Sequence, residues 1–396
     1  MQGQTNNTGL TNFDISHRKE FFSCVKRVVV KVGSGILTQE TGLNLDTVRN
    51  LSRQLAALHN SGREVILVSS GAVAAGVSKM GLAKRPTEIP EKQAAAAVGQ
   101  ASLINEYEIA FEKQAVKVAQ VLLTRDDLAA RRRYLNARNA LQTLLSWKVL
   151  PIINENDTVV VAELKFGDND NLSAMIAQLL DADVLINLTD IDGLYTGDPR
   201  TCTDAKIVPY VEKITPALEQ SASCHTGKHG TGGMASKVTA AKKANAAGIP
   251  MIVAGGATPD ILQLIFSGQE VGTFFAPKNK KMPGKKCWLG FAADPKGVFV
   301  VDQGAAKALV SNGKSLLPVG IQAVEGSFGV GAPVQVVGPD RQVLGVGLSN
   351  YSSADARKIK GCSTSQLENI LGHKAYDEVI HRDNLVVIYE DQEENP

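Results

Sequence analysis

One feature constrains the fold of this chain more than any other: short apolar runs alternate with amphipathic segments between Val28 and Gly256. Runs such as Val28–Gly33 are rich in β-branched residues and have the length of a buried strand. The segments between them repeat apolar residues every three or four positions, as a helix with one buried face requires. Strands that alternate with helices build a mostly parallel sheet covered by helices on both faces. We therefore expect an α/β fold that binds ligands outside the carboxyl ends of its strands.

The expected elements can be assigned in chain order. Strands are predicted at residues 28–33, 64–71, 117–124, 149–157, 183–190 and 249–256. Helices are predicted at residues 44–62, 93–114, 131–147, 171–182 and 235–248. The apolar face of the first helix consists of Val48, Leu51, Leu55 and Leu58. We expect Asp46 to cap the start of this helix and Gly62 to end it.

A second domain follows a break in this alternation. The segment Pro277–Lys286 contains two prolines, one glycine and five lysines, which is typical of a solvated linker. Beyond it, short strands are predicted at residues 297–302, 316–326, 332–340, 342–352 and 384–390, with one helix at residues 304–313. Gly- and Pro-rich turns separate these strands, so we expect a small, mainly β domain.

Composition narrows the class of protein. Of the 396 residues, 44% are hydrophobic and 21% are charged, which suits a globular protein with a core. The 42 basic and 40 acidic residues leave a net charge of +2, so charge gives no general case for nucleic-acid or membrane binding. The five cysteines are odd in number and lack a C-x-x-C spacing, which fits free thiols in a reducing compartment. The polar start lacks the apolar core of a signal peptide, and we expect a cytoplasmic protein.

Polar residues occur within and after the first predicted strands. Lys31 lies inside the first strand, where a lysine is costly unless its ammonium group reaches a partner or a cleft. Gly33 and Gly35 allow a ligand to approach the backbone closely, although Thr38 replaces the third glycine of a dinucleotide-binding fingerprint. After the second strand, Ser69–Gly76 can present backbone N–H groups to an anion. The alternative for the first stretch is a lysine whose ammonium group reaches solvent, followed by a turn. The alternative for Ser69–Gly76 is an ordinary loop in which a serine caps the next helix.

Further stretches carry short polar side chains. Ile153–Asp157 and Gly167–Asn171 could orient a substrate's ammonium and carboxylate groups, or form an Asx-rich turn and a helix cap. Leu188–Arg200 could contact the adenine or ribose of a nucleotide, or form a plain loop. His229–Lys237 has the glycines, hydroxyl and lysine of a phosphate loop without the spacing of a Walker A loop. His225 lies four residues before His229, but the surrounding glycines argue against a zinc site.

In this order the stretches resemble the glutamate 5-kinases of the amino acid kinase family. The family-level marks are "KVGSG", "VSSGAVAAG", "LTDIDGLYTGDPR" and "GTGGMASK", and the more specific ones are "INEND" and "GDNDNLSA". The segments "VDQGAAKAL" and "SLLPVGI" resemble a C-terminal PUA-like domain. The resemblance covers residues 28–381. It implies an amino acid kinase catalytic domain at residues 25–276 and a PUA-like domain at 288–390. Composition adds a disordered extension at residues 1–24, a linker at 277–287 and an acidic tail at 391–396, and the extension and the tail depart from the family pattern without touching a motif.

The resemblance implies that ATP phosphorylates the side-chain carboxylate of L-glutamate to L-glutamyl 5-phosphate, the first step of proline biosynthesis. A glutamate side chain has a reference pKa of about 4.3 and is ionised at neutral pH, so this reaction needs no general base. It needs two anions to be aligned and their charge to be neutralised. A site rich in Lys, Gly, Asn and Asp suits that requirement.

The resemblance also implies the site residues. Lys31 and Lys237 would stabilise the transferred phosphoryl group from opposite sides, and Asp170 would hold both lysines in place. The glutamate-binding residues would be Ser70, Asn154, Asp157, Asp168 and Asn169. The ATP-binding residues would be Lys31, Thr189, Asp190, Thr231, Gly232, Gly233, Met234 and Lys237. No metal site on the protein is implied, because Mg²⁺ would be held mainly by the ATP phosphates and water.

The implied partners and the rival interpretations complete the expectation. Proline would be a feedback inhibitor, the chain would form a homodimer or homotetramer, and the unstable product would pass to a glutamyl-phosphate reductase. No membrane or nucleic-acid partner is expected. The rivals are another member of the family, such as a UMP, aspartate or N-acetylglutamate kinase, and an RNA-binding role for the C-terminal domain. The stretch "GDNDNLSA" argues against a UMP kinase, and the C-terminal domain has no stripe of aromatic residues for stacking bases.

Overall fold

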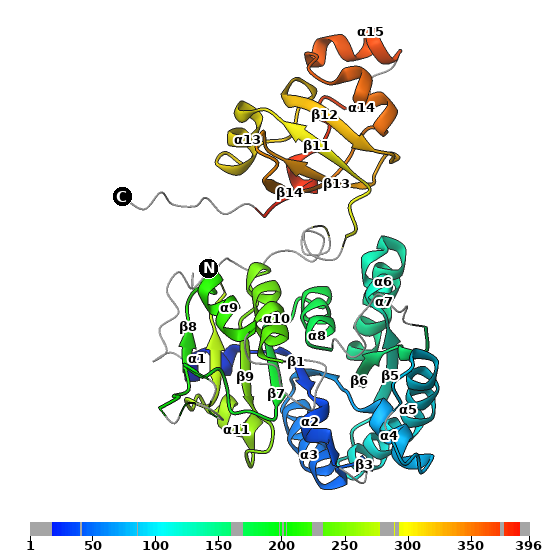
Figure 1. Cartoon of the computed structure of the whole chain (residues 1–396), viewed down its shortest axis with the longest axis vertical. Coiled ribbons are helices and arrows are strands. Elements are labelled where there is room, and N and C mark those ends of the chain that lie inside the picture. The colour runs from blue at the N-terminus through cyan, green and yellow to red at the C-terminus, as the bar shows by residue number, and fades with distance from the viewer. Residues whose placement is uncertain are drawn as a thin grey trace, which may run out of the picture. The chain divides into compact units, whose positions relative to one another are not determined.

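The computed structural model of the chain describes residues 18–39, 42–84, 86–159, 169–197, 199, 202, 204–223, 233–277, 289, 293–372 and 376–388. These residues form two compact units (Figure 1), one drawn mainly from the chain before residue 283 and one mainly from the chain after it. Each unit is described by itself below.

The expected disordered extension over residues 1–24 is wrong for its last seven residues, which form helix α1 (Arg18–Cys24). Phe22 of this helix is fully buried, and its ring lies 5.3 Å from that of Phe266. Burial of this large apolar surface orders a segment whose polar surroundings in the sequence indicate disorder. Residues 1–17, most of the expected linker and the expected acidic tail lie outside the described residues.

The first unit is built on an eight-stranded sheet with the order β5-β6-β4-β1-β7-β9-β10-β8 (Figure 1). Neighbouring strands are parallel throughout, except for the antiparallel pair β9 and β10. The strands are β1 (Arg27–Val32), β4 (Glu64–Val68), β5 (Val118–Leu123), β6 (Leu150–Glu155), β7 (Val184–Thr189), β8 (Tyr210–Val211), β9 (Met251–Gly255) and β10 (Thr273–Phe275). Two short strands, β2 (Thr38–Gln39) and β3 (Gly42–Leu43), pair separately. The expected mostly parallel sheet is confirmed.

Helices cover both faces of this sheet (Figure 1). They are α2 (Ser34–Leu37), α3 (Leu45–Asn60), α4 (Ala72–Lys79), α5 (Ile89–Glu112), α6 (Arg125–Ala129), α7 (Arg131–Ser146), α8 (Asn169–Leu179), α9 (Pro216–Ser223), α10 (Met234–Ala246) and α11 (Ile261–Phe266), and a 3₁₀ turn spans Asp157–Val159. Val28, Val30 and Val32 of β1 share a buried cluster with residues of α3, α5 and α11. Because side chains alternate along a strand, Lys31 of β1 faces the other way, toward α8 and α10.

The N-cap of helix α3 lies two residues before the expected cap, Asp46. Asn44 is the N-cap, and its side chain accepts a hydrogen bond from the backbone N–H of Thr47 at 3.1 Å. Asp46 lies inside the first turn, where it forms an ion pair with Arg49 at 3.2 Å. The prediction of Asp46 as the cap is wrong because the chain offers two capping residues, and only Asn44 has the extended backbone that a cap needs. The helix ends as expected before Gly62, which has a φ of +89°.

Two glycines bring α4 and α5 into backbone contact. A Cβ atom on Gly76 would lie 1.8 Å from the carbonyl oxygen of Ala95, and one on Gly99 would lie 1.8 Å from that of Ala72. No other residue type fits at either position, since such a separation is far below van der Waals contact. This packing holds α5 close behind the turn that joins β4 to α4.

The second unit contains a five-stranded sheet with the order β12-β11-β13-β14-β15. Its strands are β11 (Gly297–Val301), β12 (Ile321–Gly326), β13 (Pro333–Val337), β14 (Val343–Leu348) and β15 (Leu385–Val387), and its helices are α13 (Gln303–Val310), α14 (Ser353–Ile359) and α15 (Leu367–Leu371). The expected mainly β sheet and α13 are confirmed. Helices α14 and α15 were not predicted, because they are too short to display a helical period in the sequence.

Candidate functional site

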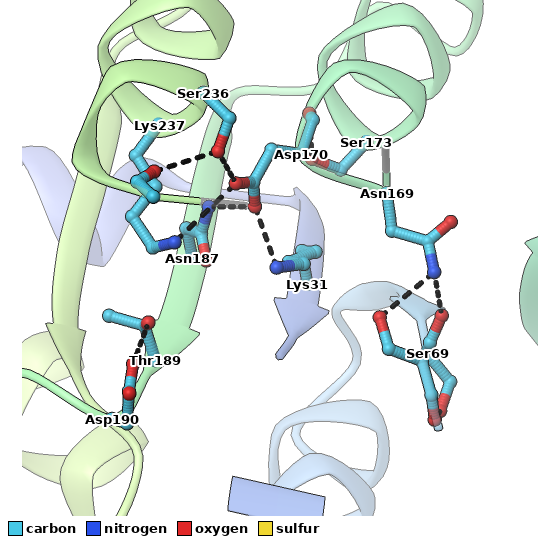
Figure 2. Close-up of polar contacts among 12 residues, drawn as sticks. Lys31, Ser69, Asn169, Asp170, Ser173, Asn187, Thr189, Asp190, Ser236 and Lys237 are labelled. Atoms are coloured by element: carbon cyan, nitrogen blue, oxygen red, sulfur yellow. Dashed lines mark hydrogen bonds and ion pairs between the residues drawn. The ribbon is translucent and has the colours of Figure 1, made fainter. Parts of the chain in front are cut away.

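The candidate site lies at the carboxyl ends of the central strands, where α8 begins (Figure 2). This helix starts with Asn169 and Asp170, and both are buried. Their side chains point in different directions: Asp170 toward β1 and α10, and Asn169 toward the residues that follow β4 (Figure 2). The start of α8 therefore joins two groups of polar side chains. We call them the Asp170 cluster (Lys31, Asp170, Asn187, Ser236 and Lys237) and the Asn169 cluster (Ser69, Ser70, Asn154 and Asn169).

The Asp170 cluster surrounds one carboxylate with four donors (Figure 2). Its Oδ1 atom lies 2.6 Å from Nζ of Lys31 and accepts a hydrogen bond from Nδ2 of Asn187 at 2.8 Å. Its Oδ2 atom accepts from Oγ of Ser236 at 2.5 Å and lies 3.5 Å from Nζ of Lys237. Both oxygens of Asp170 are thus engaged, and the carboxylate holds the two ammonium groups on different atoms.

Sheet register and helix placement assemble this cluster. Lys31 of β1 and Asn187 of β7 are paired positions on neighbouring parallel strands, so their side chains lie on the same face. Helix α10 begins at Met234, which puts Ser236 and Lys237 in its first turn. Residues from four distant parts of the chain therefore meet at the N-terminal turns of α8 and α10.

The cluster is buried and charged. Lys31, Asp170 and Lys237 are 6%, 2% and 4% exposed. Burial alone would raise the pKa of Asp170, but Lys31, Lys237 and the hydrogen bonds from Lys31 and Ser236 hold it well below its usual range. Burial lowers the pKa of Lys237, against the attraction of Asp170. With both lysines protonated, one carboxylate faces two ammonium groups, and an anionic ligand would neutralise the excess positive charge.

The Asn169 cluster orients one side-chain amide. Nδ2 of Asn169 donates to the carbonyl oxygen of Ser69 at 2.7 Å, to Oγ of Ser70 at 2.8 Å and to Oδ1 of Asn154 at 3.0 Å. Three acceptors around one nitrogen define which way the amide points. Oδ1 of Asn169 is buried and has no hydrogen-bond partner among the described residues. This oxygen is therefore available to accept a hydrogen bond from a ligand.

Asp157 lies close to the Asn169 cluster in the sequence, just after β6. Burial, with the neighbouring charge of Glu155, raises the pKa of Asp157 to about 7. Asn154, at the end of β6, is fixed from behind because its Nδ2 donates to Oε1 of Gln100 on α5 at 2.7 Å. A carboxyl group whose pKa is raised to about 7 suits the recognition of a small polar ligand.

Thr189 and Asp190 lie at the end of β7, and Oγ1 of Thr189 donates to Oδ1 of Asp190 at 2.9 Å (Figure 2). The charge of Asp190 is close enough to Lys237 to oppose the lowering of that lysine's pKa by burial. A Cβ atom on Gly35 would lie 3.3 Å from the Asp190 side chain, so the first glycine loop also comes close to this aspartate. Gly233, the last glycine of the stretch His229–Lys237, is the N-cap of α10.

The structure thus brings most of the sequence-predicted site residues to one edge of the sheet. Lys31 and Lys237 both contact Asp170, and Ser70 and Asn154 both contact Asn169. Asp168, Thr231, Gly232, His225 and His229 lie outside the described residues.

Sequence reasoning missed Asn187 and Ser236, which donate to the carboxylate of Asp170. The available signal for Asn187 is one polar residue in the apolar run "DVLINLTD", which is significant only once the sheet register is known. Ser236 directly precedes Lys237 in the sequence. The stretch His229–Lys237 indicates a phosphate loop, but nothing in it singles out this hydroxyl as a partner of Asp170.

Within the part of the chain that the structure describes, no three His, Cys, Asp or Glu side chains come together as a metal site. The helices described there include none with the length and apolar character needed to cross a membrane.

Comparisons with known proteins identify the families to which the two parts of the chain are similar. Residues 26–255 match the model of the amino acid kinase family, and residues 297–371 match that of the PUA domain. The chain is 50% identical over 372 residues to the glutamate 5-kinase of Geobacter sulfurreducens, covering 94% of this chain and 100% of that one. It is 49% identical over 372 residues to the glutamate 5-kinase of Syntrophus aciditrophicus, covering 94% and 97%. A solved structure of a UMP kinase from Bacillus anthracis aligns with 16% identity and a TM-score of 0.45, over 64% of this chain and 97% of that one.

Proposed function

Because the chain belongs to the amino acid kinase family and, within it, to the glutamate 5-kinases, we propose that it transfers the γ-phosphoryl group of ATP to the side-chain carboxylate of L-glutamate. The product is L-glutamyl 5-phosphate, and the reaction is the first step of proline biosynthesis. The observation that carries this proposal is the Asp170 cluster, in which two buried lysines meet on one carboxylate at the carboxyl edge of a parallel sheet.

The reaction moves no proton at the reacting atoms. A carboxylate oxygen of glutamate forms a bond to the γ-phosphorus, the bond between that phosphorus and the oxygen bridging to the β-phosphate breaks, and ADP leaves with the electron pair. The barrier comes from bringing two anions together, so fixed positive charge is the main requirement. Lys31 and Lys237 supply that charge from β1 and α10.

Asp170 is a positioning residue in this scheme. It does not act as a general base, because its pKa lies well below its usual range and both oxygens are occupied by donors. Its buried carboxylate aligns the two ammonium groups before substrates arrive, which removes the need to reorganise charge during transfer.

Glutamate is bound by the Asn169 cluster. The free Oδ1 atom of Asn169 and the carboxylate of Asp157 are acceptors suited to the α-ammonium group, and the hydroxyl of Ser70 is suited to a carboxylate. Asn154 orients Asn169, and Asp168, which directly precedes Asn169 in the sequence, is a further substrate-binding residue.

ATP is bound beside the Asp170 cluster. Thr189 ends β7 and Asp190 follows it. In the sequence Thr231, Gly232 and Gly233 precede Met234, the first residue of α10, whose N-terminal N–H groups favour a phosphate. Mg²⁺ fits as an ion that arrives with ATP and is held by phosphate oxygens and water, since Asp170 is already engaged by its lysines. When bound, the ion would neutralise phosphate charge.

Three further parts of the proposal come from the family. Proline acts as a feedback inhibitor at or overlapping the glutamate site. The unstable acyl phosphate passes to a glutamyl-phosphate reductase, and the chain forms a homodimer or homotetramer. The first of these is tested by whether proline raises the apparent KM for glutamate while kcat at saturating glutamate stays constant.

The function is tested with ATP and hydroxylamine, which converts an acyl phosphate into a hydroxamate. We expect hydroxamate with L-glutamate and little with L-aspartate. Adding UMP should not increase the release of ADP from ATP. Preference for aspartate or UMP would replace the proposal with another reaction of the same family.

A further inference from the structure

Tyr107 is a buried ionisable side chain that the proposed chemistry does not use. It lies on α5, is fully buried, and its hydroxyl oxygen is 3.0 Å from Oγ of Ser69, which is also fully buried. A phenylalanine would fill the same space without burying a hydroxyl group, and a buried hydroxyl destabilises the fold unless it is hydrogen-bonded. The contact between two buried hydroxyls therefore calls for an explanation beyond core packing.

Ser69 connects Tyr107 to the Asn169 cluster. Its carbonyl oxygen accepts from Nδ2 of Asn169 at 2.7 Å, and Ser70, the next residue, accepts from the same nitrogen at 2.8 Å. Its backbone N–H donates to the carbonyl oxygen of Ile153 at 2.9 Å. Tyr107 therefore contacts the residue that supplies one of the three acceptors of the Asn169 amide, the Ser69 carbonyl oxygen, and that precedes the residue supplying a second, the Ser70 hydroxyl.

The hydroxyl of Ser69 has few other partners. Besides Tyr107, the Ser69 hydroxyl has only the carbonyl oxygen of Ser70 within reach among the described residues, at 3.4 Å. The turn continues through Gly71, whose φ of +98° lies in the left-handed region. Burial raises the pKa of Tyr107 far above its ordinary value, so its hydroxyl keeps its proton at every physiological pH.

Helix α5 supports the Asn169 cluster at a second point as well. Gln100 lies seven residues before Tyr107, which places both side chains on one face of the helix. Its Oε1 atom accepts from Asn154, whose own oxygen is the third acceptor for Asn169. Tyr107 therefore acts on Asn169 through Ser69, and Gln100 acts on it through Asn154.

We infer that Tyr107 is a positioning residue for the glutamate site: its hydroxyl fixes Ser69 and thereby aligns the amide of Asn169 with the substrate. This inference rests on the proposed function, because it takes Asn169 to be a glutamate-binding residue. It assigns Tyr107 no contact with substrate and no part in the ATP site.

The first test is Tyr107→Phe, which removes only the hydroxyl and keeps the ring that packs near Phe111. We expect KM for glutamate to rise roughly fivefold to tenfold, as for the loss of about one hydrogen bond, with KM for ATP unchanged. The matched control is Tyr351→Phe, which removes a buried tyrosine hydroxyl bonded to the carbonyl oxygen of Tyr376 in the second unit. That control should leave both KM values unchanged. Equal KM values in Tyr107→Phe and the wild type, or equal rises for glutamate and ATP, would overturn the inference.

The second test asks whether Tyr107 acts through Ser69. If it does, Ser69→Ala and the double variant with Tyr107→Phe should share one KM for glutamate, whereas independent roles would multiply the two effects. Wild-type hydroxamate formation is measured first. An inactive wild type refutes the proposed function. If the wild type is active and the two substitutions multiply each other's effect on KM for glutamate, the positioning role of Tyr107 is refuted and the proposed function stands.

Discussion

Replacing Asp170 with asparagine should remove the negative charge that both lysines share while keeping the shape of the side chain. Asp170 is 2% exposed and contacts Lys31 and Lys237 on different oxygens. In Asp170→Asn both ammonium groups stay buried, but the carboxylate that contacts both of them is gone. We expect a large loss of stability and of kcat from this single change.

The magnitude follows from the two distances. The Nζ atoms of Lys31 and Lys237 lie 2.6 Å and 3.5 Å from the carboxylate oxygens, which at an effective dielectric constant of about 20 corresponds to attractions of about 6 and about 5 kcal/mol. The desolvation of three ions cancels much of this, and removing one member of a buried ion pair costs about 3–5 kcal/mol. We expect the free energy of unfolding to fall by about 4 kcal/mol and kcat to fall about 100- to 1000-fold.

The assay is denaturant unfolding with and without ATP, together with hydroxamate formation. ATP supplies negative charge to both lysines, so it should raise the unfolding midpoint of Asp170→Asn more than that of the wild type. Since the pKa of Asp170 is depressed, its contribution is present at any pH above its ordinary pKa and is lost only in acid. The deficit should therefore be the same at about pH 6 and about pH 8.

The matched control is Asp181→Asn, which breaks the ion pair between Asp181 and Arg138 at 2.7 Å. That pair is more than a quarter exposed on both sides, so the control should lose less than about 1 kcal/mol and keep full activity. An Asp170→Asn variant as stable and as active as Asp181→Asn would refute the role given to the Asp170 cluster.

Three further predictions concern other parts of the first unit. Lys237→Met should lower kcat by about 100-fold or more with only a small change in KM for glutamate; steady-state kinetics would refute the lysine's role if kcat stayed near the wild-type value. Asp157 gains its charge as the pH rises through about 7, so KM for glutamate should fall over that range in the wild type and stay flat in Asp157→Asn, and a pH profile identical in both would contradict its role. A raised carboxyl pKa weakens the fold as the pH rises toward it, so Asp157→Asn should also be more stable than the wild type at about pH 8. Gly99→Ala should lose about 3 kcal/mol of unfolding free energy or more, because its Cβ would lie 1.8 Å from the Ala72 carbonyl oxygen; an unchanged denaturation curve would contradict this.

The secondary structure of the first unit was largely predictable because burial imposes a different period on strands and helices. Lys31 could be singled out for the same reason, since an ammonium group inside an apolar strand needs a partner. The cap of α3 was harder, because Asn44 and Asp46 are both suitable cap residues and backbone geometry chooses between them. Residues Arg18–Cys24 form a helix only because Phe22 packs on the core, a tertiary effect with no local sign.

The Asp170 cluster could be predicted only in part. Asn187 becomes a site residue through the pairing of β1 with β7, and the order of strands in a parallel sheet is not encoded in their sequence order. Tyr107 likewise reads as an ordinary core residue of a long helix until the approach of α4 and α5 places it behind Ser69. Residue types indicated the chemistry, and long-range packing selected the partners.

The most direct test of the proposed reaction follows the oxygen atoms of the glutamate side chain. L-glutamate labelled with oxygen-18 in that carboxylate is incubated with the protein, ATP and hydroxylamine, and the released phosphate is examined by mass spectrometry. If the carboxylate attacks the γ-phosphorus, hydroxylamine then displaces phosphate at the carbonyl carbon, and each phosphate carries one oxygen-18 atom. Hydroxamate formed with unlabelled phosphate, or no hydroxamate from glutamate at all, would contradict the proposed transfer.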